Sequence, residues 1–263
     1  MSSRKEQKEQ ARLEREAKQQ ELAAQAQRSR RMKVIGGVLG IAAIAVLVAV
    51  VISTSGSGGG TATNAEVDEI NSQLAGIPQN GITLGEENAP ATMVEFADLK
   101  CPFCAEFATD GLPTIIEDYV KSGKVKIEFR SLTFLDQATE GTDDSTNAAK
   151  FAQATGLQNK LWNFVDLFYA QQEAENTVFA TEDFLRNVGS QVPGLDVDKA
   201  WADRDDPKVQ EELDLADEIF NREGLSGTPS FLVGPTDGTL EQVTINDLSD
   251  PTPLINAIEA AQE

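Results

Sequence analysis

The chain has 263 residues and only two cysteines, Cys101 and Cys104, three positions apart. Chance gives such a pair this spacing on the order of one time in a hundred, so a chemical explanation is needed. A mostly apolar run at 91–99 precedes the pair and is typical of a buried central strand. Pro102 stands at the position where a helix accepts proline as its first residue. The sequence therefore predicts the cysteines at a strand-to-helix turn.

The residues after the pair predict a helix and then a second strand. An apolar stripe with helical spacing runs through Leu112, Ile115, Ile116, Tyr119 and Val120. We expect Gly111 and Pro113 to kink this helix. Residues 125–130 alternate as a strand does, so the cysteines fall inside a βαβ unit. In that context C-x-x-C is a redox motif.

The rest of the chain predicts a helical segment followed by a return to the sheet. The expected helices are 161–168, 181–188, 209–220 and 251–261, and the expected strands are 227–234 and 242–245. The order β-α-β, helices, β-β-α predicts an α/β fold in which a small sheet carries a helical insertion.

The longest uncharged run, residues 34–52, predicts a single transmembrane helix. As a helix it spans about 28 Å, which matches the hydrocarbon core of a bilayer. Basic residues crowd its N-terminal flank, which places the N-terminus in the cytoplasm and the remainder outside. We expect an uncleaved signal-anchor. Small residues at 53–58 leave a cleaved signal peptide as the alternative.

Charge divides the chain into segments. Residues 1–33 carry ten Lys/Arg against five Asp/Glu and are expected to form a polar, basic cytoplasmic segment. The remainder carries twelve against thirty-eight, a net charge of −26, which excludes nucleic acid as a partner. Residues 53–80 are expected to be a flexible extracytoplasmic linker. Residues 81–263 are expected to be the folded domain.

The chain contains no histidine. This excludes Cys-His nucleophile pairs, and it excludes nearly every zinc site because two cysteines do not fill a tetrahedral shell. The remaining chemistry for the pair is thiol–disulfide exchange. A helix N-terminus stabilises a thiolate at Cys101, and Cys104 on the first turn can close a disulfide with it. The alternative is an inert staple, but such a short loop gains little stability.

Two further positions allow two interpretations each. Glu95 interrupts an apolar strand: either it is buried, with a raised pKa, and exchanges protons with the sulfurs, or it faces water at a sheet edge. Pro229 follows Thr228 at the start of a strand: either it is an ordinary trans proline or it is a cis proline packed against the disulfide.

From about residue 81 to the C-terminus, the sequence resembles the thioredoxin-fold disulfide oxidoreductases, and most closely their DsbA-like branch. The resemblance rests on three segments: GITLGEENAPATMVEFADLKCPFC, NAAKFAQATGLQNKLWNFVDLFYAQQ and EGLSGTPSFLVG. It implies a thioredoxin-like fold with a helical insertion. It also implies that Cys101 is the exposed sulfur attacked by substrate, Cys104 is the buried resolving partner and Glu95 is the buried acid. Thr228 would present its backbone to the substrate before a cis Pro229.

The resemblance further implies a function. We expect a monomeric, membrane-anchored extracytoplasmic enzyme that introduces disulfides into secreted or surface proteins. It would use its own redox-active disulfide, without a metal or other cofactor. A membrane quinone-linked protein would re-oxidise it. Strongly oxidising relatives carry histidine where Phe103 stands, which leaves the direction of electron flow open. The alternatives are a reductase for cytochrome or metallocentre assembly and a non-catalytic binding module.

Overall fold

The structure is a computed structural model that describes residues 62–139 and 141–262. The chain comprises two compact units, of which the second is Gly59–Glu263. The predicted cytoplasmic segment and transmembrane helix, residues 1–33 and 34–52, lie outside the described residues. Within the described ranges, none of the helices combines the length and apolarity that a membrane span needs.

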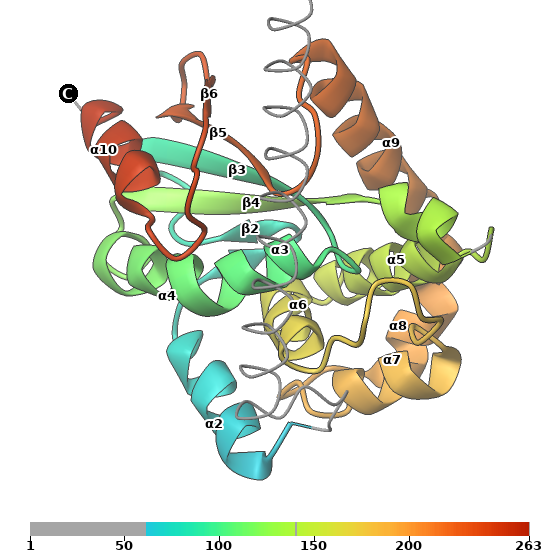
Figure 1. Cartoon of the computed structure of the whole chain (residues 1–263). Helices are drawn as coiled ribbons and strands as arrows, with labels where there is room; N and C mark the ends of the chain where they lie inside the picture. Colours follow the sequence, from blue (N-terminus) through green and yellow to red (C-terminus); the bar gives the residue numbers. More distant parts are fainter. Residues whose placement is uncertain (1–61, 140, 263) are drawn as a thin grey trace, which may run out of the picture. The chain divides into compact units, whose positions relative to one another are not determined.

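A six-stranded sheet forms the centre of the described domain, in the order β1-β2-β4-β3-β5-β6 (Figure 1). The strands are β1 Gln79–Asn80, β2 Thr83–Leu84, β3 Ala91–Asp98, β4 Val125–Leu132, β5 Ser230–Pro235 and β6 Glu241–Val243. Strand β3 pairs in parallel with β4 and antiparallel with β5. Because it has neighbours on both sides and is covered on both faces, every residue of β3 is buried.

One long helical segment follows β3, and a helical insertion follows β4. The first comprises α3 Pro102–Glu106, η1 Phe107–Gly111, α4 Leu112–Ile115 and η2 Ile116–Val120. The insertion comprises η3 Phe134–Thr139, α5 Asp144–Gly156, α6 Leu161–Ala170, α7 Glu182–Gly189, α8 Val197–Ala202, η4 Asp203–Asp205 and α9 Pro207–Arg222. Helix α10, Thr252–Ala260, follows β6. This arrangement confirms the predicted thioredoxin-like α/β fold with a helical insertion.

Two apolar clusters lie on opposite faces of β3. Met93 and Ala97 belong to the larger cluster, together with Cys104 and the apolar residues of α5 and α6. Val94 and Phe96 belong to the smaller cluster with residues of α9. Since successive strand residues point to opposite faces, Glu95 shares the face of Met93 and Ala97. That is the face covered by α3, α4 and α6 (Figure 1).

The predicted kink takes the form of two π-helical turns, η1 and η2, on either side of Pro113. Proline has no N–H to continue the regular ladder, and π turns accommodate such irregularities. Gly111 is the last residue of η1 and also has a packing role. A Cβ there would lie 2.4 Å from the carbonyl oxygen of Leu248, so glycine permits the close approach of that loop.

The predicted flexible linker, residues 53–80, is wrong in its second half. Helix α2, Asn64–Gln73, begins with a capping box in which Thr63 and Glu66 satisfy each other's backbone N–H groups. Leu74, at its end, is 2% exposed in the main core. Asn71 donates a hydrogen bond to the carbonyl of Gln191 over 3.0 Å. The folded domain therefore starts near Thr63 and not at residue 81.

Candidate active site

The two cysteines occupy the turn between β3 and α3. Cys101 is the N-cap residue of α3 with extended backbone angles, φ −73° and ψ 119°, and Pro102 is the first helical residue. The N–H of Cys104 donates to the carbonyl of Cys101 over 3.1 Å, which closes the first turn. Both cysteines are free thiols, so the structure describes the dithiol form.

The two thiols have opposite acid strengths. The pKa of Cys101 is lowered to about 6, mainly by a hydrogen bond from the Cys104 side chain, with further contributions from Thr228 and from the N–H groups of Cys104 and Phe103. Burial raises the pKa of Cys104 well above its ordinary value, and the negative charges of Cys101 and Glu95 raise it further. At neutral pH the pair therefore holds a thiolate at Cys101 and a thiol at Cys104.

Cys101 is more covered than the resemblance implied. The residue is 6% exposed and Cys104 is 0% exposed, so Cys101 is the accessible one of the two but not a freely exposed sulfur. The cover comes from the loop before β5, because the carbonyl oxygen of Thr228 lies 3.4 Å from Cys101 Sγ and accepts a hydrogen bond from Cys101 when that residue is a thiol. The Thr228–Pro229 peptide bond is cis, the second of the two alternatives for this position.

Glu95 lies in the middle of β3, between Phe129 of β4 and Phe231 of β5. It is 1% exposed, which rules out the alternative of a carboxylate at a sheet edge. Burial raises its pKa to about 8, and the negative charge of Asp166 adds to the shift. Glu95 is therefore a neutral carboxylic acid near pH 7, able to supply a proton and close enough to influence the pKa of Cys104.

Phe103, between the cysteines, is 59% exposed. Its ring offers no charge to the Cys101 thiolate, so that anion depends on hydrogen bonds and on the helix N-terminus. The ring instead gives the surface beside Cys101 an apolar contact.

The structure contains a buried ion pair next to the cysteine turn that the sequence did not predict. Lys100 is 0% exposed, and its ammonium group donates to Asp144 Oδ2 over 2.6 Å and to the carbonyl of Thr177 over 2.7 Å. The Asp144 carboxylate also accepts from the N–H groups of Phe179 and Ala180. The residue before Cys101 is thus held by the helical insertion. A lysine beside a turn is typical of a surface position, so the sequence carried no sign of this pair.

The end of α6 also supports the turn. Gln172, just after the helix, donates to the carbonyls of Leu99 and Cys101 over 2.6 and 3.2 Å. The hydroxyl of Tyr169 donates to the carbonyl of Asp98 over 3.3 Å. The sequence predicted this helix only as core, and the two polar side chains carry no pattern that would have identified them as part of the site.

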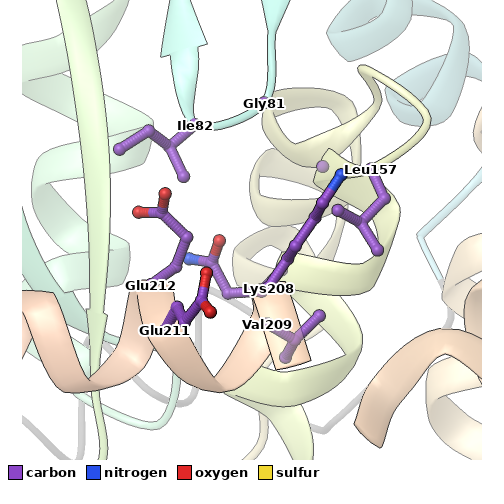
Figure 2. A pocket seen from close by; sticks show the side chains of 9 residues that line it. Gly81, Ile82, Leu157, Lys208, Val209, Glu211 and Glu212 are labelled. Carbon is purple, nitrogen blue, oxygen red and sulfur yellow. The ribbon is translucent and has the colours of Figure 1, made fainter. Parts of the chain in front are cut away.

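A pocket of about 330 Å³ lies away from the cysteines. Figure 2 shows Lys208, Glu211 and Glu212 of α9 around it, with Ile82 and Leu157 at its edges. None of the predicted site residues lines it, so the sulfur chemistry belongs to the α3 turn and not to this pocket.

Comparison with known proteins gives a family and several relatives. The thioredoxin family model matches residues 78–249. A relative from Bacillus cereus, "Probable disulfide bond formation protein D", is 30% identical over 173 residues, which cover 65% of this chain and 76% of the relative.

Solved structures share the fold. BdbD from Bacillus subtilis in its oxidised form superimposes with a TM-score of 0.58 at 21% identity, covering 71% of this chain and 97% of BdbD. MdbA, a thiol-disulfide oxidoreductase from Corynebacterium matruchotii, gives a TM-score of 0.52 at 19% identity and covers 72% and 98% of the two chains.

Proposed function

Because the chain belongs to the thioredoxin family, as a DsbA-like thiol–disulfide oxidoreductase, we propose that it introduces disulfides into secreted or surface proteins. The observation that carries the proposal is the contrast between Cys101, with a pKa of about 6, and Cys104, with a strongly raised pKa. A low thiol pKa makes Cys101 a good leaving group, and the reduced enzyme is stabilised as its thiolate. Both effects favour oxidation of substrates.

The reaction consists of two exchange steps. A substrate thiolate attacks the Cys101–Cys104 disulfide at Cys101, and Cys104 leaves with the electron pair and takes a proton from Glu95. A second substrate thiolate then attacks the substrate sulfur of the mixed disulfide and releases Cys101 as a thiolate. The substrate gains a disulfide and loses two protons to solvent, and the enzyme gains two electrons; Glu95 recovers from solvent the proton that it gave to Cys104.

We further propose that the enzyme works outside the cytoplasm, held by residues 34–52 as a membrane anchor. The uncharged run and its basic N-terminal flank support this orientation. Disulfides persist in that compartment. Each cycle leaves the enzyme reduced, so an oxidising partner is required, and a membrane protein linked to quinone has the appropriate chemistry.

The test is a trapping experiment in cells. Replacing the resolving cysteine by Cys104→Ser should leave mixed disulfides between Cys101 and cysteine-containing secreted proteins, visible as reducible adducts. The control with both cysteines replaced by serine should give none. An absence of adducts, together with intact disulfides in secreted proteins of a Cys101→Ser strain, would overturn the proposal.

A reductase for cytochrome or metallocentre assembly would use the same residues in the opposite direction. The in-vivo redox state separates the two functions: an oxidase is mostly disulfide at steady state, and a reductase is mostly dithiol. The reduction potential of the Cys101–Cys104 couple gives the same distinction in solution.

A further inference from the structure

Two buried carboxyl oxygens in the described part of the chain lack a hydrogen-bond partner: Glu95 Oε1 and Asp166 Oδ1. An unpaired polar atom inside a protein costs free energy, and such atoms are concentrated at sites with a chemical role. In the exchange reaction Glu95 acts as the proton donor to Cys104, but the reaction as described so far assigns no role to Asp166.

Asp166 stands in α6 between Trp162, at i−4, and Tyr169, at i+3, which are its neighbours on the helix surface. The ring of Trp162 packs against Phe129, the β4 residue paired with Glu95, and the Tyr169 hydroxyl donates to the carbonyl of Asp98 at the end of β3. Glu95 projects from β3 on the face that α6 covers. The charge of Asp166 is, after burial, the other influence that raises the pKa of Glu95. The charge of Asp166 therefore reaches the Glu95 carboxyl, although neither unpaired oxygen hydrogen-bonds to the other.

The two carboxyls differ in their access to solvent. Glu95 is 1% exposed and Cys104 is 0% exposed, so a proton exchanged between them stays inside the protein. Asp166 is partly exposed as a residue, although its Oδ1 atom is buried. Asp166 therefore has one carboxyl oxygen inside the protein and another part of its side chain in contact with solvent.

We propose that Asp166 is the proton outlet of the site, passing protons between Glu95 and solvent and so acting on Cys104 through Glu95. This inference rests on the proposed function. When the enzyme is re-oxidised, Glu95 first loses its proton through Asp166, which releases it to solvent. Cys104 then gives its proton to the resulting Glu95 carboxylate and attacks the mixed disulfide at Cys101, so one proton leaves in each cycle. Substrate oxidation runs the same path inward, and the electrons stay on the sulfurs.

The acidities of the groups suit such a path. Burial and Asp166 raise the pKa of Glu95 to about 8, and burial raises that of Asp166 to about 7. Proton exchange is efficient between groups with similar pKa values near the working pH. The other titratable groups around Glu95 are Cys101 and Cys104 at the α3 turn, Asp98 in β3 and Tyr169 in α6; burial raises the pKa of Tyr169 well above its usual range, so Tyr169 stays neutral.

The test follows the step that needs Cys104 deprotonated. The reduced full-length chain is mixed with oxidised glutathione between about pH 5 and pH 10, and closure of the Cys101–glutathione mixed disulfide is followed by acid quenching and mass spectrometry. Asp166→Asn should lower the maximal closure rate on the order of tenfold and move the inflection to lower pH, because the charge that raises the pKa of Glu95 is gone. Asp166→Glu should restore much of the rate.

Asp217→Asn is the matched control, since it removes one carboxylate with a raised pKa from α9, on the other side of the sheet. It should keep the wild-type profile. A carbon-13 titration of the Glu95 carboxyl gives a readout independent of turnover, and its midpoint should fall in Asp166→Asn.

If the closure rate of Asp166→Asn had the same pH profile as the wild-type protein, the proposal that Asp166 passes protons to solvent would be overturned. The proposal would also be overturned if the inflection of the profile moved while the maximal closure rate stayed unchanged, because the charge of Asp166 alone would then explain the shift. Failure of the proposed function would look different: the wild-type chain itself would not exchange disulfides with glutathione, and the outlet would fall with it.

Discussion

At the scale of single residues, Phe103 decides how strongly the Cys101 thiolate is held. The Cys104 thiol and the backbone N–H groups of Cys104 and Phe103 hydrogen-bond to Cys101 and already help to bring its pKa to about 6. The exposed phenyl ring adds no charge to this set. A charged group in place of this ring would add one more interaction that stabilises the thiolate.

Phe103→His should make the enzyme more oxidising. A protonated imidazole beside Cys101 favours the thiolate, so the pKa of Cys101 should fall by roughly one unit. The reduction potential should rise by roughly 30 mV. Thiolate absorbance and equilibration with glutathione measure the two quantities. Leu215→His, at an exposed position on α9, should change neither, and an unchanged pKa in Phe103→His would contradict the argument.

Glu95→Gln should stabilise the reduced protein by an amount that grows with pH. The pKa of Glu95 is raised from 4.5 to about 8, so between these values the unfolded chain ionises while the folded one stays neutral. Wild-type stability is therefore lost as pH rises through this window, and glutamine avoids the loss. At pH 7 the gain should approach about 3 kcal/mol, less the cost of burying the amide.

Urea unfolding at acidic, neutral and mildly alkaline pH measures this change in the free energy of unfolding. Glu87→Gln is the control, because that side chain is exposed before β3. A gain from Glu95→Gln that does not depend on pH would show that the carboxyl is not held neutral by burial.

At the scale of elements, the N-terminus of α5 is joined to the cysteine turn by the ion pair between Asp144 and Lys100. The pair spans forty-four positions of sequence and joins the helical insertion to the end of β3. Both side chains are almost fully buried, so each is the counter-charge of the other.

Asp144→Asn should destabilise the protein by about 3–5 kcal/mol, because it leaves the Lys100 ammonium buried without a counter-charge. Denaturant unfolding measures the loss. The matched control is Glu117→Gln, which breaks an exposed i,i+4 pair with Lys121 and should cost less than about 1 kcal/mol. If Asp144→Asn lost no more stability than the control variant, the ion pair would contribute little to the attachment of the helical insertion to the cysteine turn.

The sequence predicts elements better than it predicts contacts between them. The pattern of apolar residues and the position of Pro102 predicted β3 and the turn that holds the cysteines. Such features depend only on residues that are close together in the sequence. Helix α2 was missed because its capping box at Thr63 and Glu66 lies in a segment judged by its Gly/Ser/Thr-rich start. Lys100 was not predicted as part of the site because its partner Asp144 is distant in sequence and no periodicity marks a buried charge.

At the scale of the whole molecule, the negative charge acts on encounter rates. The chain from residue 53 onward has a net charge of −26, and Glu106, Glu173 and Glu175 are exposed on segments next to the cysteine turn. Such a surface attracts cationic polypeptides and repels anionic ones over about one Debye length.

A dithiol peptide flanked by lysines should therefore be oxidised faster than one flanked by glutamates, by on the order of tenfold at low salt. The difference should shrink as ionic strength rises, and a serine-flanked peptide should show little dependence on salt. Stopped-flow rates over a salt series measure the effect. Equal rates for the two charged peptides at low salt would show that the acidity serves solubility alone.

The ion pair between Lys100 and Asp144 also limits which parts of this fold can be removed or exchanged. A helical insertion invites the view that it is an accessory module, removable to leave a minimal thioredoxin. Here the module supplies the counter-charge to the residue before Cys101, and its helix α6 leads into the glutamine that holds the carbonyl of Cys101 itself. Deleting or exchanging the insertion would strand a cation under the reactive sulfur. Engineers who graft substrate specificity onto this scaffold must therefore transplant Lys100 and Asp144 together.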